Sequence, residues 1–190
     1  MFTATTVVDL ARRGELEIAD TVSRYLPHVP PAAAGITLHQ LLTHTAGLPE
    51  GIGDDFDLVS RDDVITRGLS HLDSAATGPF AYSNLGYSLL AAVVEMVAGR
   101  PLEEYLAERL FIPLGMPRTG TFFDESLRDA LAYGTTDAGA QPPISDRIRT
   151  IAPDYWNLKG NGGLQSTVED MATWASTPED HTRCDERSDL

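Results

Sequence analysis

The stretch Phe80-Ala81-Tyr82-Ser83-Asn84-Leu85-Gly86-Tyr87 stands directly before the longest apolar segment of this sequence. Ser83 or Asn84 can cap a helix there, and Gly99 is placed to end it. Residues two apart in an extended lead-in point the same way, so Tyr82 and Asn84 direct a phenol and a carboxamide into one space. The helix N-terminus adds a positive field that favours an anion. On these residues alone, the simpler interpretation is a packed tyrosine followed by a capping asparagine.

Signals for further helices lie on both sides of this stretch. Met1 to Gly14 predicts an amphipathic helix with no capping residue before it. Two capping boxes follow the pattern of a Ser or Thr three residues before Gln or Glu: Thr37-Leu38-His39-Gln40 and Ser166-Thr167-Val168-Glu169, the second opening a helix through Trp174. Two more helices are predicted near residues 61–69 and, after Pro101, over 102–110, while residues 119–157 indicate short segments that include edge strands.

Composition excludes several classes of partner. The 190 residues carry 14 basic and 28 acidic side chains, a formal net charge of −14. Nucleic-acid grooves and anionic membrane surfaces require clustered Lys and Arg, so neither partner is expected. Thirteen of the basic residues are arginines, and Lys159 is the single lysine. A mechanism that needs two lysines therefore cannot be complete in these residues.

Membrane, metal and cofactor sites are not indicated. The apolar run from Leu85 to Val94 is too short to span a bilayer. The first ten residues lack the basic region of a signal peptide, which leaves the location of the protein open. Cys184 is the only cysteine, and the five histidines show no metal-ligand spacing. Nucleotide-binding glycine loops and the Gly-x-Ser-x-Gly elbow are absent from the sequence, so no cofactor is expected.

Four segments occur in a familiar order: Thr37 to Pro49, Tyr82 to Tyr87, Leu110 to Thr119 and Gly160 to Thr167. With them the chain resembles the serine β-lactamase-like family of class C β-lactamases, D-Ala-D-Ala carboxypeptidases and esterases, from Phe2 to about Ser176. The resemblance implies an α+β fold of the β-lactamase/transpeptidase type, of which this chain holds mostly the helical subdomain and few strands. Residues 1–176 are then a partial domain, and 177–190 a polar tail predicted to be disordered.

The resemblance also implies roles for individual residues. Tyr82 matches the general base or proton shuttle, and Asn84 the residue that orients the substrate amide and a neighbouring lysine. Glu50 matches a loop position bordering the substrate cleft, although an acidic loop residue is ordinarily only solvated. Asn161, Gly162 and Gly163 match a glycine-rich segment near the cleft, with a flexible turn as the alternative. The implied partner is a small acyl substrate.

Two of the three catalytic motifs of this family are missing from the sequence. Phe2-Thr3-Ala4 matches the segment that follows the Ser-x-x-Lys motif, so we expect the nucleophile to precede Met1. Lys159-Gly160-Asn161 and His44-Thr45-Ala46 match neither Lys-Thr-Gly nor His-Thr-Gly. A phenol near neutral pH stays protonated unless positive charge favours its anion. We therefore expect Tyr82 to be inert and this chain alone to be catalytically incompetent.

Alternatives stay open at this point. The chain can be a piece of a serine hydrolase acting on a lactam, peptide or ester, a non-catalytic binding module, or a decayed remnant. Its oligomeric state is open. Because the family's sheet strands lie outside these residues, we also expect exposed apolar surface and marginal solubility.

Overall fold

The computed structural model describes residues 1–54, 57–121, 132, 134–137, 139–141 and 155–177. The chain forms two compact units, one of Met1–Leu102 with Asp154–Gly162 and one of Glu103–Pro153 with Gly163–Leu190. The described part of the first unit is helical: α1 (Phe2–Arg12), η1 (Val22–Arg24), η2 (Pro31–Ala33), α2 (Leu38–Leu42), α3 (Arg61–Asp63), η3 (Val64–Gly68), η4 (Ser74–Ala76) and α4 (Asn84–Ala98).

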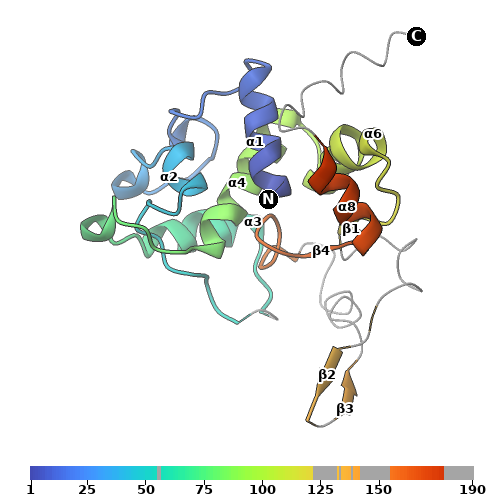
Figure 1. Ribbon diagram of the computed structural model, residues 1–190. Helices are drawn as coiled ribbons and strands as arrows, with labels where there is room; N and C mark the ends of the chain where they lie inside the picture. The colour runs from blue at the N-terminus through green and yellow to red at the C-terminus, as the bar shows by residue number, and fades with distance from the viewer. Residues whose placement is uncertain (55–56, 122–131, 133, 138, 142–154, 178–190) are drawn as a thin grey trace. The chain divides into compact units, whose positions relative to one another are not determined.

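Helix α4 is the centre of the first unit, with α1 and α2 packed beside it (Figure 1). The Ser83 hydroxyl caps it by accepting a hydrogen bond from Gly86 N at 3.0 Å. Gly99 ends the helix in the left-handed conformation, φ +66°, which costs glycine little because it has no Cβ. Its residues from Leu89 to Val94 are all buried, so the predicted helix and both of its ends are confirmed.

Three other predicted helices of this unit are also confirmed. Helix α1 begins after Met1 without a side-chain cap, as its sequence indicated. The Thr37–Gln40 capping box is present at α2: the Thr37 hydroxyl accepts from Gln40 N, and the Gln40 side chain accepts from Thr37 N. The short helix near residues 61–69 is α3 continued by the π-helical turn η3.

A later segment of the chain, Tyr155 to Gly162, folds back onto α4. Trp156 N donates to Val59 O at 3.0 Å, and the Thr3 hydroxyl donates to Gly160 O at 2.6 Å. Gly160 has φ +83°, and a Cβ there would lie 2.6 Å from the Tyr87 carbonyl oxygen. Only glycine allows this close approach. The hydrogen bonds to Val59 and Thr3 and the close approach of Gly160 to Tyr87 therefore hold this segment against the rest of the first unit.

The second unit is described by itself. Its described elements are α5 (Leu102–Leu106, of which Leu102 is counted with the first unit), η5 (Ala107–Phe111), α6 (Ile112–Leu114), β1 (Gly120–Thr121), β2 (Gly134–Thr136), β3 (Gly139–Gln141), β4 (Leu164–Gln165) and α8 (Val168–Ser176). The strands form two antiparallel pairs, β1 with β4 and β2 with β3. Edge strands predicted between residues 119 and 157 are thus present, and the helix predicted over 102–110 is divided among α5 and η5.

The N-cap predicted for α8 is wrong by one residue. Thr167 caps the helix by accepting from Asp170 N at 3.2 Å. Ser166 is engaged elsewhere, its hydroxyl lying 2.7 Å from that of Thr119. The buried Asp170 carboxylate also accepts from Arg118 N and from the Thr119 hydroxyl, both at 2.8 Å. Asp170 therefore fixes both the helix start and its attachment to the residues before β1.

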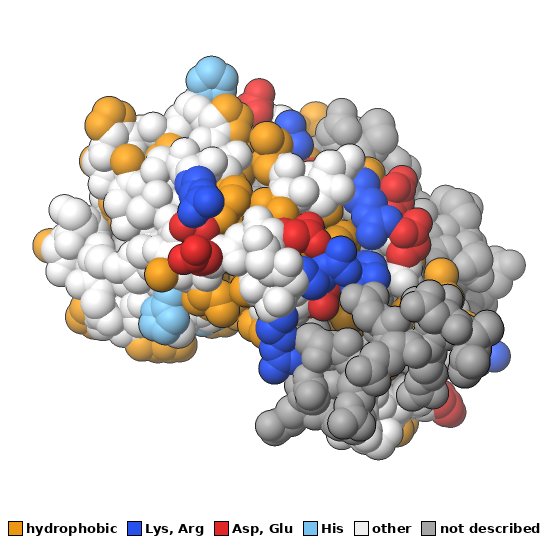
Figure 2. Space-filling model, turned by 90° about the horizontal axis from the view of Figure 1, so that it is seen from above, with side chains coloured by type: hydrophobic (Ala, Val, Ile, Leu, Met, Phe, Trp, Pro, Cys, Tyr) orange, Lys and Arg blue, Asp and Glu red, His pale blue; other side chains and the backbone are white. Residues whose placement is uncertain are grey.

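Apolar side chains also lie at the surface among polar ones (Figure 2). Phe80, Ile112 and Val168 are the most exposed large examples among the described residues, at 71%, 72% and 82%. No single described helix is long and apolar enough to cross a membrane, and α4 with Leu102–Leu114 meets that test only when the two are joined. The tail predicted over 177–190 lies outside the described residues except for Thr177, so its disorder stays a prediction.

Candidate functional site

The Tyr82–Asn84 pair lies at the start of α4, where its sequence placed it. The Tyr82 hydroxyl donates to Asn84 Oδ1 at 3.0 Å, and 55% of the Tyr82 side chain is exposed. Among the described residues, the Asn84 Nδ2 group has no hydrogen-bond partner. The phenol and carboxamide do occupy one space, and the amide retains two donors for a ligand.

The loop that follows α2 fixes the start of this helix. The Ser83 hydroxyl donates to Pro49 O at 2.6 Å, and Leu85 N donates to Glu50 O at 3.0 Å. Leu85 N is one of the first-turn amides that a helix leaves without an internal partner. The Pro49–Glu50 carbonyls therefore accept the donors at the α4 start, and they join segments 34 positions apart in sequence.

His44, in the loop that follows α2, contacts the residues at the start of α4. Its ring stacks on Tyr87 with centroids 5.0 Å apart and lies 4.7 Å from the ring of Tyr82. Its Nδ1 accepts from Ser83 N at 3.1 Å. Burial lowers the pKa of His44 below its ordinary value. Burial raises the pKa of Tyr87, with a smaller contribution from the charge of Tyr82, so Tyr87 stays neutral beside it.

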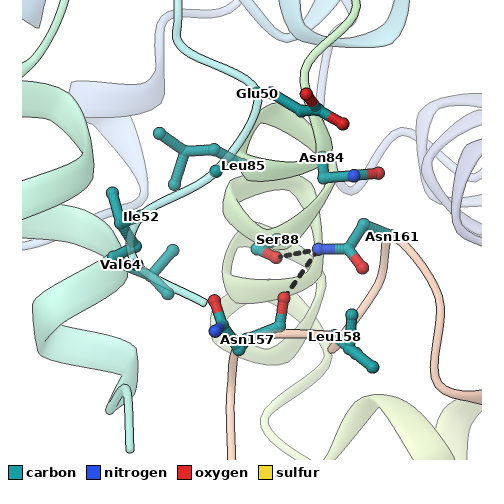
Figure 3. Close-up of a pocket in the computed structure, with 11 residues that line it drawn as sticks. Glu50, Ile52, Val64, Asn84, Leu85, Ser88, Asn157, Leu158 and Asn161 are labelled. Carbon is teal, nitrogen blue, oxygen red and sulfur yellow. Dashed lines mark hydrogen bonds between the residues drawn. The ribbon is translucent and has the colours of Figure 1, made fainter. Parts of the chain in front are cut away.

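A pocket that Asn84 lines lies entirely within the first unit (Figure 3). Its volume is about 290 Å³, which is near the lower limit for ligand pockets. The polar side chains that line it are those of Glu50, Asn84, Ser88, Asn157 and Asn161. The apolar wall comes from Ile52, Val64, Leu85 and Leu158. The lining is therefore more polar than the predominantly apolar walls of most small-molecule sites.

Asn161 holds one side of the pocket to α4. Its Nδ2 donates to Ser88 Oγ and to Asn157 O, both at 2.9 Å (Figure 3). The Asn157 side chain in turn donates to Asp54 O. Both donors of the Asn161 amide are thus used, which leaves its Oδ1 as the acceptor available to a ligand.

Lys159 does not line the pocket, because its side chain pairs with Glu95. Its Nζ lies 2.8 Å from Glu95 Oε1 and 4.6 Å from the ring centroid of Trp156. The same Glu95 oxygen accepts from Leu102 N at 3.0 Å, and its other oxygen lies 3.6 Å from Arg61. The side chains of Glu95 and Lys159 are 10% and 16% exposed. The lone lysine therefore joins a nearly buried ion pair with Glu95 of α4 and supplies no positive charge to the pocket.

The predicted site residues divide between the two units. Glu50, Asn84 and Asn161 line the pocket, and Tyr82 bonds to one of them. Gly162 does not line it: it is exposed, and its N donates to Leu158 O at 3.1 Å. Gly163 belongs to the second unit. Among the described residues, no group of His, Cys, Asp or Glu could hold a metal ion.

Sequence reasoning missed Ser88, Asn157 and the role of His44. Ser88 lies one helical turn after Asn84, so the i, i+4 spacing on α4 was the available signal for it. Asn157 and Asn161 have the same spacing but belong to no helix, and nothing local indicates that they turn toward α4. In the sequence, His44 is indicated only as part of the family-like segment from Thr37 to Pro49.

Comparison with known proteins identifies relatives of nearly the whole chain. The family model described as Beta-lactamase matches residues 1–188. Penicillin-binding protein 4 of Amycolatopsis lactamdurans is 31% identical over 190 aligned residues, covering 92% of this chain and 47% of that protein. The chain spans about a third to a half of the length of the curated relatives it matches.

Solved structures of proteins of this kind are also similar to the chain. The β-lactamase/D-alanine carboxypeptidase from Yersinia pestis, complexed with citrate, has a TM-score of 0.71 at 28% identity, covering 96% of this chain and 54% of that one. The octameric penicillin-binding protein homologue from Pyrococcus abyssi has a TM-score of 0.69 at 27% identity, with 92% and 42% covered.

Proposed function

This chain belongs to the beta-lactamase family, and we propose that it carries the tyrosine–asparagine part of a serine hydrolase active site. The family resemblance and the α+β fold expected from the sequence are confirmed by these relatives. The proposed reaction is the hydrolysis of a small acyl substrate, a lactam, peptide or ester, through an acyl-enzyme. The proposal rests on the hydrogen bond of Tyr82 to Asn84, which lines the pocket, and on the unused Asn84 amide.

The proposed roles follow from donor and acceptor capacity. The Asn84 Nδ2 hydrogens bind the carbonyl oxygen of the substrate's amide side group, while Oδ1 holds the Tyr82 hydroxyl. In acylation Tyr82 acts as the phenolate: a serine Oγ bonds to the substrate carbonyl carbon and its proton passes to the phenolate oxygen, which restores the hydroxyl that Asn84 Oδ1 accepts. The bond from that carbon to the leaving nitrogen or oxygen then breaks, and Tyr82 returns the proton to the leaving group.

Acylation needs groups that these 190 residues do not contain. No serine has a lysine three residues after it, and neither Lys-Thr-Gly nor His-Thr-Gly occurs. Among the residues that line the pocket, Glu50 is the one with a charge, and it is negative. The pocket lining therefore offers no cation of the kind that a general-base phenolate requires. We therefore propose that the chain alone positions the tyrosine and the substrate but does not react.

Covalent labelling tests the inactivity of the chain alone. A fluorescent penicillin and a fluorophosphonate are each incubated with the purified chain, and adducts are measured by intact-mass spectrometry. We expect no adduct with either reagent. Stoichiometric labelling of any serine contradicts this part of the proposal.

A graft tests the roles of Tyr82 and Asn84. Residues 2–176 replace the matching segment of a family member that fluorescent penicillin labels, so that they lie between its Ser-x-x-Lys and its third motif. We expect labelling, and we expect Tyr82→Phe to slow it by a factor of about 10²–10⁴, the usual contribution of acid–base catalysis. Tyr25→Phe, which removes a phenol hydroxyl bonded to Asp20, is the matched control. A folded graft whose labelling is unaffected by Tyr82→Phe refutes the assignment.

A further inference from the structure

His44 contacts the turn formed by Tyr82, Ser83 and Asn84 through its backbone, its ring nitrogen and its ring face. Its carbonyl oxygen accepts from Ala81 N at 2.8 Å, and its ring nitrogen Nδ1 accepts from Ser83 N at 3.1 Å. The ring also lies between those of Tyr82 and Tyr87, with Phe80 edge-on at 5.8 Å. His44 adopts φ +56°, an unusual conformation for a residue other than glycine.

The hydrogen bond to Ser83 fixes the protonation state of the ring. A backbone N–H can only donate, so His44 Nδ1 must hold a free lone pair and the ring proton must be on Nε2. Ser83 is the N-cap of α4, and it is 3% exposed. The amide of an N-cap has no partner inside its own helix. His44 therefore satisfies a buried donor that nothing in α4 can satisfy.

We propose that neutral His44 is a positioning residue that holds the Tyr82–Ser83–Asn84 turn, and that a proton on its Nδ1 releases the turn. The proton takes the lone pair that Ser83 N–H uses, so bond and protonation exclude each other. Two donors are then directed at one another, and the Ser83 amide must turn away. Because Ser83 lies between Tyr82 and Asn84, its movement changes the 3.0 Å contact between them.

The surroundings of His44 favour the neutral ring. Within the described part of the chain, the titratable groups that face it are the phenols of Tyr82, before α4, and of Tyr87, on α4. The Tyr87 hydroxyl donates to Leu42 O at 3.2 Å, and burial raises its pKa, so it stays neutral while His44 titrates. Burial lowers the pKa of His44, and within the described residues no charged side chain contributes to that shift. The release is thus expected on the acid side of 6.5, the ordinary value.

Nuclear magnetic resonance of the chain tests this without any catalytic activity. The ¹⁵N shift of His44 Nδ1 reports whether it is a free acceptor, and the Ser83 amide and Tyr82 ring signals report the turn. Between pH 8 and pH 5 we expect all three to move with one midpoint below 6.5. A proton on Nδ1 at neutral pH, or a Ser83 amide that does not follow the His44 titration, overturns the proposal.

His44→Asn separates positioning from simple packing. The Asn oxygen occupies the place of Nδ1, accepts from Ser83 N without titrating, and Asn tolerates a positive φ. We expect this variant to keep the Ser83 amide signal of the neutral protein and to lose its pH dependence. The control is His39→Asn, at an exposed position of α2, which should retain the full transition. If His44→Asn exposes the Ser83 amide to exchange at every pH, the ring matters only by packing and the proposal fails.

The proposal depends on the proposed function only in treating Tyr82 and Asn84 as catalytic. Its measurements are made on the chain alone, whereas the roles of Tyr82 and Asn84 are tested by labelling of the graft. A graft that is not labelled leaves the His44 titration unaffected, and a Ser83 amide that ignores pH leaves the labelling unaffected. The two failures are therefore distinguishable.

Discussion

Substitution of Gly160 by alanine tests whether the close approach of residues 155–162 to α4 holds the pocket together. The new Cβ would lie 2.6 Å from both the Tyr87 carbonyl oxygen and Ala91 Cβ. Contacts that short force the backbone of the segment to move away from the helix. Gly160 also has φ +83°, which an L side chain adopts only at a cost of about 1–2 kcal/mol.

The expected magnitude follows from these two terms. Overpacking of a filled interior costs about 1–3 kcal/mol, so with the backbone term Gly160→Ala should lower the free energy of unfolding by about 2–5 kcal/mol. Gly162→Ala is the matched control, because a Cβ there meets only Leu158 at 4.0 Å and needs no positive φ. We expect its effect to stay within about 0.5 kcal/mol.

Urea unfolding followed by tryptophan fluorescence measures both variants. A Trp174→Phe background leaves Trp156 as the reporter, and Trp156 belongs to the segment under test. The Asn161–Ser88 hydrogen bond should also weaken, since Asn161 directly follows the displaced residue. Equal urea midpoints for Gly160→Ala and Gly162→Ala refute the argument that this approach is tight.

Three further predictions concern the groups around the site. Lys159→Met removes the closest cation from the nearly buried Glu95 and should lower the free energy of unfolding by about 1–3 kcal/mol. The control Arg67→Met, at an exposed pair with Asp63, should lower it by at most about 0.5 kcal/mol. Equal losses in the two variants would contradict this prediction. Ser83→Ala removes the α4 cap and the donor to Pro49 O, and thermal unfolding should show a loss of about 2 kcal/mol against roughly 1 kcal/mol or less for the exposed cap Ser60→Ala. Because the folded-state pKa of His44 lies below 6.5, the unfolded chain binds more protons as the pH falls toward it, so His44 contributes stability above pH 6.5 that is lost as the pH falls through the folded-state pKa. Urea midpoints from pH 8 to pH 5 should show this loss in the wild type and less of it in His44→Asn.

The helices were predictable because their signals are local. Capping residues, apolar periodicity and a terminal glycine all act within a few positions, and α1, α2 and α4 begin where those signals placed them. The start of α8 was predicted one residue too early, because Ser166 with Glu169 fits the usual capping box whereas the structure uses Thr167 with Asp170. Contacts of Thr119 with Ser166 and Asp170 decide between them, and those contacts join residues about 50 positions apart.

The pocket was predictable only in part, for the same reason. Tyr82 and Asn84 are two residues apart, so their pairing follows from backbone geometry. Asn161 reaches Ser88 across 73 positions, and only folding brings them together. Family resemblance selected Asn161 without its contact, and it selected Gly162, which does not line the pocket. Resemblance thus identified the neighbourhood of the site, while hydrogen-bonding capacity identified its members.

Under the proposed function, substrate binding and activation of Tyr82 depend on groups of different charge. The pocket side chains provide carboxamides, a hydroxyl and one carboxylate, which suffice to orient a neutral acyl group. Activation of the Tyr82 phenol needs positive charge, but Glu95 holds the lone lysine on another part of α4. Asn84 is bonded to Tyr82 and also lines the pocket, so it connects the proposed catalytic phenol with the side chains proposed to hold the substrate.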